Sequence, residues 1–144
     1  MSKLALGSAL PPEHLQLLGQ IVQKYYDQFD NNRAGITFYT PESTLTFESA
    51  TFVGRDAILE KLQNLPFTRL QHQVETLDAQ LNAATNTYMV LVTGRLLVDE
   101  EQRPMTYTQF FLIAPNPHTS EPNFAARNEE EIYIHSDIFK LIFP

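Results

Sequence analysis

The stretch TYMVLVTGRLLV, residues 87–98, decides the fold of this chain. If it is extended, successive side chains point to opposite faces of a sheet. One face would carry Tyr88, Val90 and Val92, and the other face Met89, Leu91 and Thr93. Because both sets are largely apolar, the pattern predicts a strand that is covered on both faces. We expect helices over one face, and a second subunit is a candidate for the other.

Long extended segments surround this strand in the sequence. Residues 69–81 precede it, and residues 105–113 and 132–142 follow it, so the second half of the chain predicts a strand meander. The last two segments are separated by APNPHTSEPNFAARNEEE, residues 114–131. Its prolines, its asparagines and its final run of glutamates predict a long solvated hairpin loop, and its composition favours disorder.

The first half of the chain predicts a long helix. Apolar residues recur every three or four positions from Pro11 to Phe29, which is typical of a helix with one buried face. The sequence Asp-Asn-Asn at 30–32 interrupts this pattern. A shorter helical stretch is expected to follow as far as Tyr39.

A hairpin and a second helix are predicted before the meander begins. Residues 44–48 and 51–53 alternate like the two strands of a hairpin. The apolar pattern of residues 57–65 fits a helix, which Pro66 ends. This order of elements predicts an α+β fold for a single domain spanning residues 1–144, with helices on one side of a curved antiparallel sheet.

Composition limits the classes of function. The chain has no cysteine, which excludes disulfides and thiolate metal sites. Its 17 acidic and 10 basic residues give a net charge of −7, and the basic residues are scattered rather than gathered into the stripe that phosphate binding needs. We therefore expect no direct binding to nucleic acid or to an anionic membrane. An acidic surface favours basic protein partners.

Neither a targeting segment nor a cofactor motif is recognisable. The beginning, MSKLALGSALPPE, has one lysine and a short, broken apolar stretch, too little for a signal peptide. No apolar run approaches the roughly 20 residues of a membrane-spanning helix, so a soluble intracellular protein is expected. The histidines, at positions 14, 72, 118 and 135, have no metal-ligand spacing, and there is no glycine-rich phosphate loop. We predict no cofactor.

Six segments, taken in order, match one known family. They are IVQKYYDQFDNNR (21–33), TLTFES (44–49), FVGRDAILEKLQNLPF (52–67), LQH (70–72), VTGRLLVDEE (92–101) and SDIFKL (136–141). On these segments the chain resembles the nuclear transport factor 2 family from Pro12 to Phe143, apart from the 114–131 loop. The resemblance implies a cone-shaped curved sheet and a carrier rather than an enzyme. Such a carrier binds the GDP form of the small GTPase Ran and is found in the cytoplasm and nucleus, enriched at the nuclear pore.

The family's contact with Ran implies an apolar pocket with an acidic rim. An aromatic side chain of Ran enters the pocket, which by position would be lined by Phe47, Leu65, Leu70, Met105, Phe110 and Phe139. Rim acids that pair with basic residues of Ran match Glu48, Asp99 and Glu101. Phe47 stands where the family usually has tryptophan, and Glu101 stands where it has aspartate.

The resemblance also implies two further interfaces. The family forms homodimers by packing sheet faces together, and Leu91 and Ile138 fall at matching positions. Nucleoporins with FxFG repeats are the second class of partner. For these, Asp30 matches a contributing position, and His14 falls where animal members carry tryptophan.

Two alternatives stay open from the sequence. The first is an isomerase or dehydratase of the same fold, which requires a carboxylate or histidine of tuned pKa inside the cavity. Its candidates are His72, Asp78, Tyr107, His135 and Asp137, but the uniformly apolar lining expected for the cavity favours a binding protein. The second is a subunit of a heterodimeric messenger-RNA-export scaffold, which would use the outer sheet face for a different protein.

Overall fold

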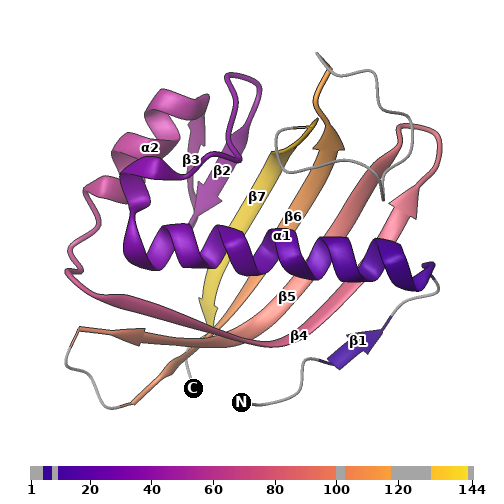
Figure 1. Cartoon of the computed structure of the whole chain (residues 1–144). Helices are drawn as coiled ribbons and strands as arrows, with labels where there is room; N and C mark the ends of the chain where they lie inside the picture. Colours follow the sequence, from indigo (N-terminus) through magenta and orange to yellow (C-terminus); the bar gives the residue numbers. More distant parts are fainter. Residues whose placement is uncertain (1–4, 8–9, 100–102, 118–130, 143–144) are drawn as a thin grey trace.

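The computed structural model describes residues 5–7, 10–99, 103–117 and 131–142. Its elements are β1 (Ala5–Gly7), α1 (Pro12–Asn31), the 3₁₀ turn η1 (Arg33–Gly35), β2 (Thr44–Phe47), β3 (Ala50–Val53), α2 (Arg55–Gln63), β4 (Leu70–Asn82), β5 (Thr87–Val98), β6 (Met105–Pro115) and β7 (Ile132–Ile142). The strands form one seven-stranded sheet in the order β1-β4-β5-β6-β7-β2-β3 (Figure 1). The predicted α+β class is confirmed.

The sheet is mixed rather than wholly antiparallel. Strands β4 to β7 form the predicted antiparallel meander. Two parallel pairings extend it, β2 with β7 on one side and β1 with β4 on the other. The prediction of an antiparallel sheet was therefore wrong for two pairings, β1 with β4 and β2 with β7, whereas the edge strand β3 pairs antiparallel with β2. Strand β1 was not predicted at all, because three residues are too few to show an alternating pattern.

Helix α1 crosses one face of the sheet, which we call the inner face (Figure 1). Its predicted apolar stripe is buried there, including Leu18, Val22 and Tyr25. From β5, the predicted set Tyr88, Val90 and Val92 is buried against the helix side. Burial of these apolar side chains is the main driving force for packing the helix on the sheet. Neither helix of the described chain has the length and apolarity needed to cross a bilayer.

Two predicted boundaries were wrong. Helix α1 continues through Asn31, and the helical stretch expected to reach Tyr39 is only the 3₁₀ turn. The reason is that the segment after the turn bonds to strand β7. The Phe38 carbonyl accepts a hydrogen bond from the Ile134 backbone N–H at 2.8 Å. Such pairing with a strand is incompatible with a helical carbonyl at Phe38.

The predicted 114–131 loop begins later than expected. Strand pairing continues through Ala114 and Pro115, which lie opposite Tyr133 and Ile132. The backbone N–H of Asn116 then donates to the Glu131 carbonyl at 2.8 Å, which closes the base of the hairpin. Residues 118–130 lie outside the described residues, so the expected disorder there stays a prediction.

Candidate protein-binding site

One end of the sheet gathers most of the predicted pocket residues on the inner face. Phe47 ends β2 opposite Phe139, and Met105 begins β6 opposite Leu96. Leu70 begins β4 opposite Val98, which ends β5. These strand ends meet at one end because the β5–β6 hairpin reverses there. Leu65, just after α2, belongs to the same buried core. Four of the six predicted residues therefore lie on the inner face of the sheet, and Leu65 belongs to the core on the same side.

Aromatic rings form a column at this end. The rings of Phe47 and Phe139 stack with centroids 4.8 Å apart, and Phe139 stacks in turn on Tyr107 at 5.5 Å. Tyr107 meets His72 edge to face at 5.4 Å. Phe139 and Tyr107 are buried, whereas Phe47 is only half-buried. The column therefore runs from the core to a partly exposed ring.

Other half-buried apolar side chains pack against the same hydrophobic core. They include Phe52, Phe67, Met105 and Leu141. The sequence prediction missed Phe52, Phe67 and Leu141, together with the buried Leu96 and Val98. The alternation of residues 88–92, continued along β5, would have placed Leu96 and Val98 on the inner face. We call Phe47, Phe52, Phe67, Met105 and Leu141 the apolar end.

Phe110 does not belong to this group, and its prediction as a pocket residue was wrong. In β6 it lies opposite Leu91 of β5 and Ile138 of β7. Residues directly opposite each other in a sheet point to the same face, and Leu91 and Ile138 are 45% and 49% exposed on the face away from α1. Phe110 therefore joins the two predicted dimer residues on the outer face. Met89 and Leu112, the next cross-strand pair on that face, extend this outer patch.

The rim residue Glu48 is held by the backbone around it. Glu48 and Ser49 form the two-residue turn between β2 and β3, and both have positive φ angles, 48° and 75°. This conformation is unfavourable for residues other than glycine, asparagine and aspartate. The Glu48 carboxylate accepts a hydrogen bond from the Leu141 backbone N–H, and its own N–H donates to the Phe139 carbonyl at 3.2 Å. These bonds fix the carboxylate beside Phe47.

Asp99 is held in a similar way at the end of β5. Its φ angle is 50°, and its Oδ1 atom accepts hydrogen bonds from the backbone N–H groups of Thr68 and Arg69, at 2.9 and 2.8 Å. Its backbone N–H donates to the Arg69 carbonyl at 2.8 Å. Asp99 is exposed, so its charge faces solvent. The third predicted rim acid, Glu101, lies outside the described residues.

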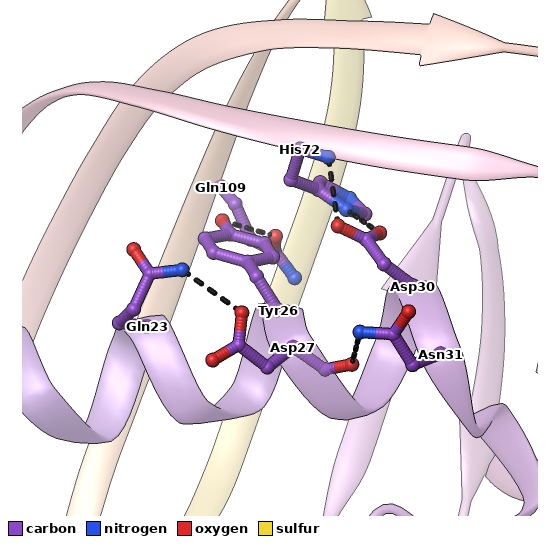
Figure 2. A network of polar contacts seen from close by, with 7 residues as sticks. All are labelled: Gln23, Tyr26, Asp27, Asp30, Asn31, His72 and Gln109. Carbon is purple, nitrogen blue, oxygen red and sulfur yellow. Dashed lines mark hydrogen bonds and ion pairs between the residues drawn. The ribbon is translucent and has the colours of Figure 1, made fainter. Parts of the chain in front are cut away.

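The two predicted nucleoporin residues lie near opposite ends of α1. They are 16 positions apart, which is about 24 Å along a helix. Asp30 is engaged by β4, because its carboxylate accepts from the His72 backbone N–H at 2.9 Å and lies 2.6 Å from the His72 ring nitrogen Nδ1 (Figure 2). His14 lies 2.7 Å from the Tyr88 hydroxyl through its Nδ1. One protomer does not bring Asp30 and His14 together.

The enzyme candidate Asp137 is sealed in a buried network. Its Oδ2 accepts from the hydroxyls of Tyr39 at 2.7 Å and Tyr25 at 3.3 Å, and its Oδ1 accepts from the Gln109 amide at 2.7 Å. Gln109 in turn accepts from Tyr26 at 2.8 Å (Figure 2). Burial raises the pKa of Asp137 to about 6, against the lowering effect of these donors. Asp137 is only 1% exposed, so its carboxyl group belongs to the hydrogen-bond network of the core and is closed to solvent.

The remaining candidates do not complete an acid–base site. Tyr107 is fully buried, and burial raises the pKa of its hydroxyl well above the usual range of tyrosine. Asp78 is exposed opposite Leu91 on the outer face, and His135 contacts the neighbouring Ser136 hydroxyl at 2.9 Å. His72 stacks on the Tyr26 ring at 4.4 Å and is paired with Asp30. These contacts tie β4 to α1 through His72.

A polar hollow of about 500 Å³ lies between the last turns of α1 and the start of β4. Leu70 and Asp99 line it, and they also belong to the predicted pocket and rim. Asp27 and Asp30 of α1 add two more carboxylates to its wall (Figure 2). Arg69 lies in the same wall, so the hollow is lined by three carboxylates and one guanidinium group.

Comparison with known proteins identifies the family. The sequence matches the nuclear transport factor 2 (NTF2) domain over residues 17–141. Nuclear transport factor 2 of Emericella nidulans is 45% identical over 125 residues, covering 86% of this chain and 91% of that protein. The protein of the same name from Schizosaccharomyces pombe is 40% identical over 126 residues, covering 87% and 93%.

A solved structure agrees with these relatives. Nuclear transport factor 2 from Cryptosporidium parvum superposes with a TM-score of 0.76 at 30% identity, covering 94% of this chain and 100% of that chain. The resemblance drawn from the six segments is confirmed. The chain therefore belongs to the nuclear transport factor 2 family, whose members act in nucleocytoplasmic transport and are not enzymes.

Proposed function

We propose that this protein is a nuclear import carrier that binds the GDP form of the small GTPase Ran at the apolar end. One observation carries this proposal: two half-buried aromatic residues each adjoin a carboxylate that backbone hydrogen bonds hold in place. Glu48 follows Phe47, and Asp99 accepts from the backbone N–H of Thr68, the neighbour of Phe67. A cavity for catalysis would need an acid or base among its lining residues, whereas the apolar end consists of apolar side chains, and the neighbouring carboxylates of Glu48 and Asp99 accept backbone hydrogen bonds. Family membership supports a carrier of this kind.

Affinity is expected to come from one aromatic residue of Ran packed against Phe47. A ring that fills a desolvated apolar site contributes more than the contacts around it. The Phe139 ring behind Phe47 stiffens this wall. Little conformational entropy is then lost on binding, because the wall is formed in advance.

The two rim carboxylates are expected to pair with basic residues beside that aromatic. Rim charges act mainly on the association rate, the salt dependence and the orientation of the partner. Glu101 and the carboxylates of the polar hollow belong to the same negative region of the proposal. A switch segment that moves on nucleotide exchange would withdraw the aromatic and release Ran.

The outer patch is the proposed homodimer interface. Leu91, Phe110 and Ile138 lie side by side on three neighbouring strands, and two of them are nearly half exposed. An apolar group of this kind favours burial against a partner, and a twofold pair is the commonest solution. A dimer would carry two Ran sites and two weak sites for FxFG repeats. Bivalency would then increase the avidity for tandem repeats in the nuclear pore.

The site is tested with variants that remove charge but keep the hydrogen-bond acceptor. Asp99→Asn retains an Oδ1 for the Thr68 and Arg69 amides, and Glu48→Gln retains an acceptor for Leu141. We expect the double variant to associate with Ran-GDP about tenfold more slowly than wild type at low salt. The difference between the two association rates should shrink as the salt concentration rises. Glu13→Gln, an exposed acid in the first turn of α1, is the matched control. Binding of the double variant at the wild-type rate would contradict the proposal.

The molar mass of the purified chain in solution distinguishes the homodimer from the heterodimeric scaffold alternative. A purified chain that is a stable dimer by light scattering supports the homodimer. A monomer that binds neither form of Ran would support the scaffold instead.

A further inference from the structure

Lys61 lies against the aromatic wall of the apolar end. Its Nζ atom is 5.8 Å from the centroid of the Phe47 ring and 5.5 Å from that of Phe52. The two rings point the same way, because Leu45 lies opposite Phe52, and Phe47 lies opposite Ala50 in the β2–β3 hairpin. Helix α2 therefore places one ammonium group over two rings.

This ammonium group occupies surface that a guest ring would use. Phe139 stacks on one face of Phe47, which leaves the other face for Lys61. A cation over an aromatic face is attracted by the ring's electrons. Within the described part of the chain, no carboxylate lies within ion-pair distance of Lys61. Its contacts are thus the rings themselves, and Lys61 is half-buried.

We propose that Lys61 is a cationic cover that sets the charge selectivity of the apolar end. This inference rests on the proposed function and deepens it. A guest ring that packs on Phe47 displaces the ammonium group from the ring or removes part of its water. A positive charge on the guest near α2 is then repelled, and a negative charge there is attracted. The basic flank of a guest is thereby directed away from α2 and toward Asp99.

Lys140 provides a matched control. It lies at the same end of the sheet, but its Nζ donates to the Ser49 hydroxyl at 3.1 Å and it is exposed. Lys61→Met and Lys140→Met remove the same charge and keep a similar chain length. Only the first removes an ammonium group from the two rings.

The first experiment does not involve Ran. Benzylammonium and benzoate, an aromatic cation and an aromatic anion, are titrated into the isotope-labelled protein and followed by NMR at Phe47 and Phe52. We expect Lys61→Met to bind benzylammonium about two- to fivefold more tightly than wild type and benzoate less tightly. Lys140→Met should bind both as wild type does. Equal affinities in Lys61→Met and wild type, or no binding of either probe to both proteins, would overturn the proposal.

The second experiment applies the same variants to Ran-GDP. Lys61→Met should associate faster and bind about two- to fivefold more tightly, whereas Lys61→Arg should behave as wild type. If Lys61→Met bound Ran-GDP more weakly than wild type does, the proposed role of Lys61 would be overturned. If wild type itself ignores Ran-GDP, the proposed carrier function fails, and the probe titration still decides the role of Lys61.

Discussion

The rings of Phe47 and Phe139 stack almost parallel, with their planes 5° apart, although Phe47 ends β2, in the first half of the chain, and Phe139 lies in β7, near the C-terminus. The parallel pairing of β2 with β7 puts them directly opposite each other. The hairpin is thereby fixed to the meander at the apolar end. The proposed wall for a guest is consequently a product of tertiary structure and not of one local segment.

Replacing Phe47 by alanine should weaken Ran-GDP binding strongly. The variant loses the outer ring of the column and leaves Phe139 open to water. Loss of a central aromatic contact costs about tenfold in affinity or more. Titration calorimetry on the folded variant measures its dissociation constant for Ran-GDP.

Phe110→Ala is the control for that change, since it removes the same ring from the opposite face of the sheet. It should retain Ran-GDP affinity per protomer and weaken self-association instead. The reverse pattern, with Phe110→Ala losing Ran and Phe47→Ala keeping it, would restore the original assignment of Phe110 to the pocket.

The sequence predicted the parts of this site that depend on local pattern. The alternation of residues 87–98 gave both faces of β5, and hence the inner Val90 and the outward Leu91. The apolar stripe of α1 predicted which side the helix buries. These predictions agree with the structure because the backbone sets the side-chain period of strands and helices.

The other parts of the site depend on the register between strands, which no local sequence pattern specifies. The prediction placed Phe110 in the pocket, but its position opposite Leu91 and Ile138 puts it outside. The two-residue turn at Glu48 and Ser49 lacks the glycine or asparagine typical of such turns, so it was not predicted in detail. Its hydrogen bond to Leu141, 93 positions away, appears only once β2 lies beside β7.

The outer patch should control the oligomeric state. Ile138→Arg places a charge in the middle of the exposed apolar group, where an unpaired charge would be buried in a dimer. We expect the variant to sediment as a monomer at concentrations where wild type is a dimer. Val53→Arg is the control, since Val53 is 67% exposed on edge strand β3 outside the patch. If Ile138→Arg remains a dimer while Val53→Arg dissociates, the interface lies elsewhere.

Gly94 should tolerate no side chain. A Cβ atom there would lie 2.2 Å from the Gln73 carbonyl oxygen and 3.0 Å from the Tyr107 side chain. Because backbone cannot move as a flexible side chain does, Gly94→Ala should lower the free energy of unfolding by about 2 kcal/mol or more. Gly19→Ala on α1 meets nothing within 4 Å and should raise it by about 0.5–1 kcal/mol. Urea unfolding of both variants and of wild type gives these free energies. An unchanged free energy of unfolding in Gly94→Ala would show that β4 can shift.

Asp137 should make the protein more stable as the pH falls from 7 toward 4. Its pKa in the folded state is about 6, above the ordinary aspartate value of 3.8, so the folded protein binds the extra proton in this range. The stabilising effect is complete below the unfolded pKa and is lost as the pH rises through the folded pKa. This group alone contributes a slope of roughly 1.4 kcal/mol per pH unit between those limits.

Asp137→Asn isolates that contribution, because an amide of similar shape cannot titrate. The difference in unfolding free energy between wild type and this variant should grow in favour of wild type on acidification. A difference that stays constant from pH 7 to 4 would mean that Asp137 titrates normally despite its burial.

Nucleotide discrimination tests the central claim most directly. The dissociation constant of the wild-type chain is measured for Ran loaded with GDP and for Ran loaded with a non-hydrolysable GTP analogue, at the same salt concentration. We predict tight binding to the GDP form and at least about a hundredfold weaker binding to the GTP form, since only one state of the switch presents the aromatic residue. Equal affinity for the two forms, or no binding to either, would contradict the account.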